Sequence, residues 1–123
     1  MNVLVNVTHQ EMAMEQARLW LVMTTVETQA QGEQLARRLV EQRLAACVSL
    51  GQPVTSVYPW QGTIESASEV PLWIKTTPER LPALKSALDE HHPYDVPEML
   101  AVPVNDGLEA YFRWAQEWIN DEQ

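Results

Sequence analysis

The sequence predicts an α+β domain of the ferredoxin-like type: βαββαβ with an additional C-terminal helix and an antiparallel sheet. Three observations predict this fold. Apolar stretches of strand character alternate with helical stretches in the order β-α-β-β-α-β. The length of 123 residues suits a single domain. Finally, the strands are apolar on both faces, so both faces of the sheet need a cover.

The domain is expected to begin near residue 18. We expect residues 1–17 to form an N-terminal extension of uncertain structure and residues 18–123 to form the single domain. The first predicted strand runs from Arg18 to Thr25. Both faces of this strand are apolar, because Trp20 and Val22 point to one face while two leucines and a methionine point to the other. This pattern indicates an interior strand.

A helix and a long hairpin are predicted next. The helix opens at Thr28 and Gln31, a capping-box pair, and continues to Arg43. The hairpin runs from Ala45 to Thr76, with a kink at Gly51–Pro53 and a turn that ends near Gly62. Each arm is far longer than the usual strand of about five or six residues. We therefore expect the hairpin to project beyond its own domain and to need a neighbour.

The last third of the chain predicts a second helix, a strand and a third helix. The second helix opens at Pro78, and Pro82 delays its regular start by a turn. A short apolar strand follows from Glu98 to Val104. Asp106 with Glu109 is then expected to cap the third helix. Since this helix and the hairpin cannot cover the second sheet face alone, contact with other subunits is the simplest solution.

The charge and the cysteine count limit the function classes. Seventeen acidic residues against eight basic ones give a formal charge of −9, which repels phosphate backbones and anionic lipids. We expect no nucleic acid and no membrane as partners. No stretch approaches the ~20 apolar residues of a membrane span, and the start of the chain lacks the pattern of a signal peptide. With one cysteine there is no intrachain disulfide, and a cytoplasmic location is expected.

Three stretches carry a family resemblance: Leu35 to Leu50, Val54 to Thr76, and His91 to Val104. They contain LAACV, SVYxWxG, IKT and HPYxVPE in that order, and together they resemble the CutA family of divalent-cation tolerance proteins. The resemblance implies a very stable homotrimer in which each hairpin reaches onto the adjacent subunit. It also implies divalent-metal tolerance, copper above all. The family is similar to the PII signal proteins, which implies regulation through an unidentified protein partner.

Two residues depart from the family pattern. Pro71 stands where such relatives usually carry an aliphatic residue, and proline cannot donate a ladder hydrogen bond. A bulge or an edge position is expected there. Met23 stands where one enterobacterial branch of the family carries a copper-associated cysteine.

His91, His92 and Met23 are the predicted metal ligands. Imidazole suits copper, zinc and nickel, thioether suits Cu(I), and the two histidines resemble the pair to which copper binding is ascribed in that branch. Adjacent helical residues point about 100° apart, so both reach one ion only if the helix has unwound near Pro93. The alternative is that the imidazoles complement the helix dipole by roughly 0.3 to 1 kcal/mol. Carboxylates of the same motif complete the candidate set: Asp95 and Glu98.

A second candidate site is a ligand cleft at a subunit interface. Its candidates are one cation, one carboxylate and three aromatic residues, which lie at strand ends and in loops. They are Tyr58, Trp60, Lys75, Tyr94 and Glu98. The alternative is packing between subunits, where tyrosine and tryptophan are favoured. Cys47, within an apolar segment, is expected to be a buried core thiol without a catalytic role.

The function predicted from these observations is that of a trimeric divalent-metal tolerance or response protein, either metal-binding or PII-like. We expect copper or another divalent cation and no organic cofactor. An enzyme is not expected, since the sequence has no glycine-rich phosphate loop, nucleophile elbow, HExxH motif or metal-spaced cysteine set. The alternatives are a small-molecule enzyme with interface clefts and a purely structural trimer.

Overall fold

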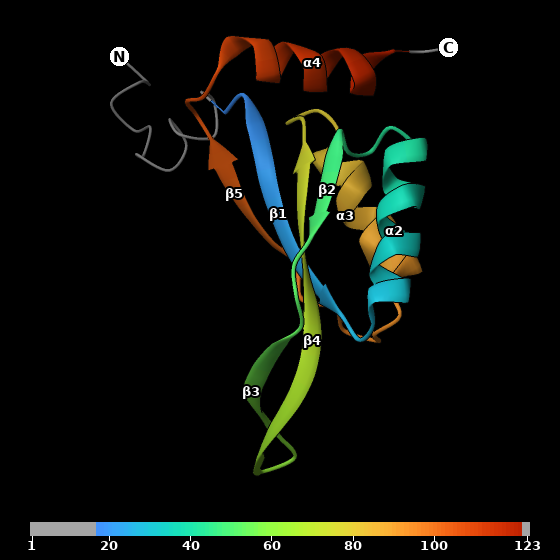
Figure 1. Ribbon diagram of the computed structural model, residues 1–123, viewed down its shortest axis with the longest axis vertical. Helices are drawn as coiled ribbons and strands as arrows, with labels where there is room; N and C mark the ends of the chain where they lie inside the picture. The colour runs from blue at the N-terminus through green and yellow to red at the C-terminus, as the bar shows by residue number, and fades with distance from the viewer. Residues whose placement is uncertain (1–16, 122–123) are drawn as a thin grey trace, which may run out of the picture.

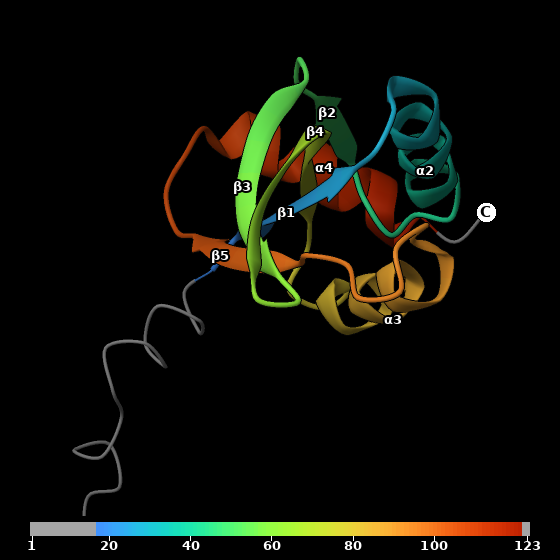
Figure 2. The same ribbon diagram turned by 90° about the horizontal axis from the view of Figure 1, so that it is seen from below.

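The computed structural model describes residues 17–121 and has the predicted order of elements (Figure 1). All but the last residue of the predicted N-terminal extension lies outside this range. The elements are β1 (Leu19–Val26), α2 (Gln29–Glu41), β2 (Cys47–Leu50), β3 (Val54–Trp60), β4 (Thr63–Thr76), α3 (Leu81–His91), β5 (Leu100–Val104) and α4 (Glu109–Asn120). Helices α2 and α3 lie on one side of the sheet, whereas α4 crosses one end (Figures 1 and 2). The predicted α+β fold is confirmed.

The sheet is antiparallel, in the order β2-β4-β1-β5, and β3 pairs with the outer part of β4. Strand β1 lies between β4 and β5, so that Met23 pairs with both Trp73 and Leu100. The interior position predicted for this strand is confirmed. None of the helices between residues 17 and 121 has the length and apolar character that a membrane span needs.

Two apolar clusters hold the domain together. The larger one packs alternate residues of β1 and β4 against α2 and α3, and its fully buried members include Val22, Leu72, Ile74, Leu39, Leu84 and Leu88. The smaller cluster lies under α4, where Phe112, Ala115 and Ile119 pack on Leu19 and Ala46. Because side chains alternate along a strand, the residues between those of the larger cluster face away from α2 and α3. Within residues 17–121, most of that second face therefore has no helix over it.

The hairpin of β3 and β4 projects from the domain as a ribbon, residues 54–69 (Figure 1). Leu50 pairs with Leu72, but Val54 pairs with Glu69. Residues 51–53 of one arm thus lie opposite residues 70–71 of the other, and one extra residue in one arm is typical of a β-bulge. The structure differs from the prediction of a bulge or an edge position at Pro71. Pro71 lies inside the continuous strand β4 and pairs with Thr25 of β1, and the extra residue lies in the facing arm.

Pro71 explains where β2 ends. The carbonyl of Pro71 accepts the N–H of Gly51 at 2.9 Å, but proline has no N–H to return. The carbonyl of Gly51 instead accepts a hydrogen bond from the Gln29 side chain at 3.2 Å. The ladder stops at this pair, and the chain turns into the ribbon.

The helix starts follow the predictions in two cases and differ in the third. The Thr28 hydroxyl accepts from Gln31 N–H at 3.1 Å and the Gln31 side chain accepts from Thr28 N–H at 3.2 Å, a complete capping box. Helix α3 begins at Leu81, after the predicted delay, with Pro82 in its first turn.

The predicted cap of the third helix was wrong. Its N-cap residue is Leu108, which makes no side-chain cap bond. The carboxylate of Asp106 accepts the N–H of Gly107 at 2.9 Å, so it stabilises a local turn before the helix. The end of α4 is tied to α2 instead, because Trp118 donates its indole N–H to the Val40 carbonyl at 3.1 Å.

Candidate functional site

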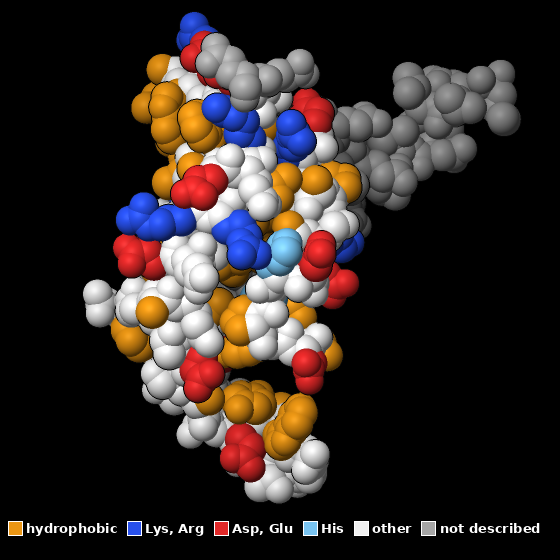
Figure 3. All heavy atoms as spheres, turned by 90° about the vertical axis from the view of Figure 1, so that its right-hand side faces the viewer, with side chains coloured by type: hydrophobic (Ala, Val, Ile, Leu, Met, Phe, Trp, Pro, Cys, Tyr) orange, Lys and Arg blue, Asp and Glu red, His pale blue; other side chains and the backbone are white. Residues whose placement is uncertain are grey.

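A cleft of about 1160 Å³ lies between the ribbon and the loop that joins α3 to β5. It is lined by Thr25, Ser56, Val57, Tyr58, Trp60, Glu65, Ala67, Glu69, Tyr94, Asp95, Val96, Pro97 and Glu98. These lining residues include no lysine or arginine. The lower part of the molecule in Figure 3 likewise has hydrophobic and acidic side chains around a hollow, while the basic side chains of this view gather higher up.

The ribbon supplies one wall of the cleft through its register. Tyr58 pairs with Glu65 and Ser56 pairs with Ala67, and paired residues of an antiparallel ladder point to the same side. The ribbon contributes Tyr58 and Trp60 to the cleft, and the loop after α3 contributes Tyr94 and Glu98. Four of the five predicted cleft residues therefore line one cleft.

The structure does not bring Lys75 to this cleft. Lys75 pairs with Cys47 at the end of β4 that is farthest from the ribbon tip. Its ammonium donates to the Ser49 hydroxyl at 2.8 Å and lies 3.8 Å from the Cys47 sulfur. Cys47 is half-buried rather than fully buried. Its basic neighbour comes from the paired strand, which local sequence does not reveal.

Glu69 lies at the inner end of the cleft and holds a network of hydroxyl groups. One of its oxygens accepts from the Thr25 hydroxyl at 2.8 Å and from the Tyr94 hydroxyl at 3.3 Å, and the Ser56 hydroxyl also bonds this carboxylate. Burial by itself raises the pKa of Glu69, but the hydrogen bonds from Thr25, Ser56 and Tyr94 outweigh it, and the pKa is lowered. The carboxylate is therefore ionised at neutral pH.

His92 holds two members of this network in place through hydrogen bonds to their backbones. It is 7% exposed, and its Nε2 lies 2.7 Å from the Thr25 carbonyl, to which it must donate because a carbonyl only accepts. Its Nδ1 accepts the N–H of Tyr94 at 3.0 Å. These partners define the neutral tautomer with its proton on Nε2. Burial lowers the pKa of His92 from its ordinary value, and the Thr25 bond and the Glu69 charge oppose the shift only in part.

Tyr94 is held on both sides. Its ring packs edge-on against the His92 ring at 4.9 Å between centroids. Burial first, and then the nearby Glu69 charge, raise the pKa of Tyr94 to about 12. The Tyr94 hydroxyl thus stays protonated and donates to Glu69 throughout the physiological range.

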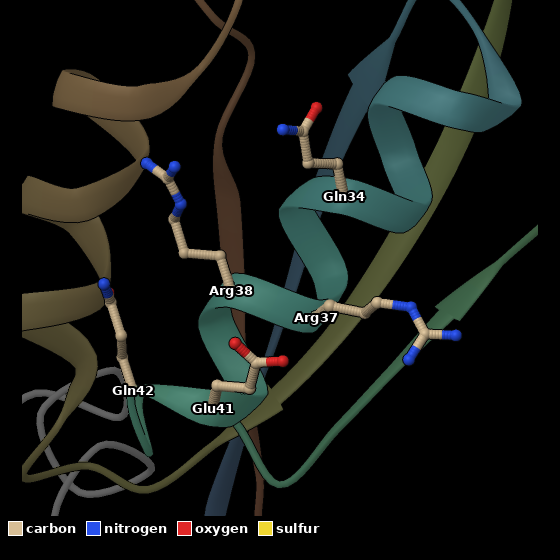
Figure 4. Close-up of a pocket in the computed structure, with 5 residues that line it drawn as sticks. All are labelled: Gln34, Arg37, Arg38, Glu41 and Gln42. Atoms are coloured by element: carbon tan, nitrogen blue, oxygen red, sulfur yellow. The ribbon is translucent and has the colours of Figure 1, made fainter.

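His91 points elsewhere. Its Nδ1 lies 2.8 Å from a guanidinium nitrogen of Arg38 on α2, and its Nε2 lies 3.9 Å from the Glu90 carboxylate. The hollow of about 540 Å³ near Arg38 is lined by five polar side chains of that helix region, which spread apart rather than converge (Figure 4). They are Gln34, Arg37, Arg38, Glu41 and Gln42. This surface forms no site of converging groups.

The predicted metal ligands have other partners as the protein is folded. Both ring nitrogens of His92 and one of His91 are already bonded, and Met23 lies between Trp73 and Leu100 in the sheet. Between residues 17 and 121, no group of three or more His, Cys, Asp or Glu side chains is arranged to hold a metal ion. A metal at His91 and His92 requires His92 to release Thr25 or Tyr94. The metal site therefore stays a prediction.

Sequence reasoning missed Glu69, the centre of the cleft network. One signal was available, since Glu69 stands directly before the apolar run Val70–Ile74 of β4 and two residues before Pro71. A half-buried carboxylate in such a strand needs hydrogen-bond donors. Those donors come from β1, β3 and the loop after α3, so only the folded chain identifies them.

Comparison with known proteins gives consistent relatives. The family model of the CutA1 divalent ion tolerance protein matches residues 20–118. The divalent-cation tolerance protein CutA of Thermus thermophilus is 40% identical over 97 residues, which are 79% of this chain and 94% of that protein. Protein CutA of Mus musculus is 45% identical over 85 residues, which are 69% of this chain and 48% of that protein. The chain thus spans about half the length of the mouse relative.

Solved structures agree with these relatives. The crystal structure of CutA from Xylella fastidiosa matches with a TM-score of 0.82 at 38% identity, covering 85% of this chain and 100% of that chain. The structure of CutA from Synechococcus elongatus matches with a TM-score of 0.80 at 41% identity, covering 83% of this chain and 90% of that one. From the family model, the identities and the shared fold together, we conclude that this chain belongs to the CutA1 divalent ion tolerance protein family.

Proposed function

We propose that the protein is a homotrimeric divalent-cation tolerance protein that acts as a PII-like response module, with the cleft at the ribbon as its effector site. The names of its relatives support the link to divalent cations. The observation that carries the proposal is apolar surface that the described part of one chain leaves exposed. It has two parts: the sheet face away from α2 and α3, called the open face, and the ribbon.

The open face carries exposed apolar side chains at Trp73, Leu100 and Val102. On the ribbon, Ile64 is 72% exposed and Val57 is 68% exposed. Burying side chains of this size stabilises an assembly by roughly 1.5–3 kcal/mol each. A ribbon on one copy that packs on the open face of the next is a head-to-tail contact, and such contacts close into a ring when the rotation between neighbouring copies closes. Three copies are the number that the family resemblance implies.

Ring closure would bring a neighbouring subunit beside each cleft, because the cleft is lined partly by the ribbon. Occupancy of the cleft could then alter the packing between subunits, which is the property that a response module needs. An enzyme is not proposed, since the hydroxyl groups of the cleft network donate to a carboxylate whose lowered pKa makes it a weak base. A cytoplasmic location also belongs to the proposal. Because other relatives are described as chloroplastic and periplasmic, this location is proposed for the present chain and not for its whole family.

Cell growth tests the role of assembly. Cells that lack this protein should regain copper tolerance with the wild-type chain but not with Ile64→Asp, which places a charge in the proposed contact. Glu33→Asp on the exposed surface of α2 serves as the control and should restore growth. Equal rescue by wild type and Ile64→Asp would separate tolerance from assembly and contradict the proposal.

The metal site is tested separately. We propose copper binding at His91, His92 and Met23, with His92 exchanging one hydrogen bond for the ion. Calorimetric titration with Cu²⁺ should then give weaker binding for His91→Ala and for His92→Gln than for the wild type. Unchanged copper affinity in both variants removes this site and leaves the cleft as the element through which the protein responds.

A further inference from the structure

The chemistry of the cleft indicates the charge of its ligand. Four carboxylates line it, Glu65, Glu69, Asp95 and Glu98, and no basic side chain does. Glu69 is the least exposed of them and is held ionised by hydroxyl donors. A carboxylate offers about four acceptor positions, and three hydroxyl groups bond this one. The remaining capacity suits a cationic donor.

The aromatic walls indicate that this cation is organic. Tyr58 and Trp60 line the cleft from β3, and Tyr94 lines it from the loop after α3. Aromatic faces attract ammonium groups through their quadrupole and cover the methylene groups attached to them. A bare metal ion gains little from such walls, because it needs several ligand atoms at about 2.0–2.6 Å. The carboxylates of this cleft are not arranged in that way.

The spacing of the carboxylates favours a ligand with more than one charge. Glu65, Ala67 and Glu69 lie on the same side of β4, since side chains alternate along a strand. At about 3.3 Å per residue, Glu65 and Glu69 are roughly 13 Å apart along the strand. Tyr58 pairs directly with Glu65, so an aromatic ring lies beside the outer carboxylate. A cation at each end of an aliphatic chain matches this arrangement.

We propose that the cleft binds a linear aliphatic polyammonium ion, with one ammonium group at Glu69, another toward Glu65, and its methylene chain against Tyr58 and Trp60. The inference rests on the proposed function only in taking this cleft as the effector site. It adds the chemical class of the effector. The ligand would contact both the ribbon and the loop after α3. Binding of the ligand would therefore affect the position of the ribbon relative to the domain.

The test is calorimetric titration of the full-length protein with spermidine. Glu69→Gln keeps an acceptor for the hydroxyl donors but removes the charge, and it should weaken binding by roughly tenfold or more. Trp60→Leu, at an exposed ribbon position, should weaken binding by about threefold or more. The matched control is Glu33→Gln, which removes the same charge from the exposed surface of α2 and should leave the affinity unchanged.

Ligand analogues complete the test. Octane-1,8-diamine should bind, and octane-1,8-diol of the same length should not. The proposal is overturned if spermidine does not bind, if the diol binds as well as the diamine, or if Glu33→Gln weakens binding as much as Glu69→Gln. Ultracentrifugation of the same samples separates this inference from the proposed function. A trimer that binds no polyamine overturns only the ligand class, whereas a monomer that binds spermidine overturns only the assembly.

Discussion

Replacing His92 is predicted to destabilise the protein by an amount that depends on which of its two hydrogen bonds the new side chain keeps. His92→Phe fills the space but leaves the Thr25 carbonyl and the Tyr94 N–H without their partner. A buried polar group left unsatisfied costs about 1–3 kcal/mol, so the loss of two partners should lower the free energy of unfolding by roughly 2–6 kcal/mol. His92→Gln can still donate to Thr25, and His92→Asn can still accept from Tyr94. Each of these should cost about half as much.

The assay is urea unfolding at neutral pH and one fixed protein concentration, since association contributes to the stability of an oligomer. His91→Phe is the matched control. His91 bonds the exposed Arg38 and Glu90, so its replacement should change the free energy of unfolding by less than about 0.5 kcal/mol. Equal losses for His91→Phe and His92→Phe would refute the reasoning, because the two bonds of His92 would then contribute nothing specific.

Three further predictions follow from the same structure. Stability should fall as the pH drops below 6.5, because the lowered pKa of His92 lets the unfolded chain take up that proton first; urea titrations near pH 5 and pH 7.5 should show a smaller difference for His92→Gln. Thr28→Ala should cost about 1 kcal/mol by chemical denaturation, while Thr28→Ser should keep the capping box. Gly51→Ala should lower the melting temperature by an amount equivalent to roughly 1–3 kcal/mol, since its Cβ would lie 2.8 Å from the Trp73 ring, whereas Gln52→Ala should be nearly neutral.

Local patterns predicted most of the fold because they act within a few residues. The Thr28–Gln31 capping box and the delay at Pro82 both depend on neighbours along the chain, and both are present. The long hairpin was also predictable, because its two arms are joined by a short turn. The prediction that Asp106 caps α4 was wrong for a local reason as well. Its carboxylate bonds the next N–H, Gly107, and leaves the start of α4 to Leu108.

The site was harder to predict because its contacts join distant parts of the chain. Thr25 and Glu69 are 44 residues apart, and His92 and Thr25 are 67 apart, yet each pair is hydrogen-bonded. The sequence resemblance pointed to His92 as a metal ligand, but the folded chain gives both of its nitrogens to the backbone. Lys75 was a cleft candidate because it is a cation near the end of a strand, but it pairs with Cys47 in the sheet, away from the cleft. Motif membership identified the right loops without identifying the roles of their side chains.

The central claim is that the ribbon and the open face of one chain are completed by two further chains. Sedimentation equilibrium at micromolar concentration tests this claim most directly. The account predicts one species with the mass of three chains for the wild type, and smaller species for Ile64→Asp. A wild-type protein that stays a folded monomer across that concentration range would contradict it.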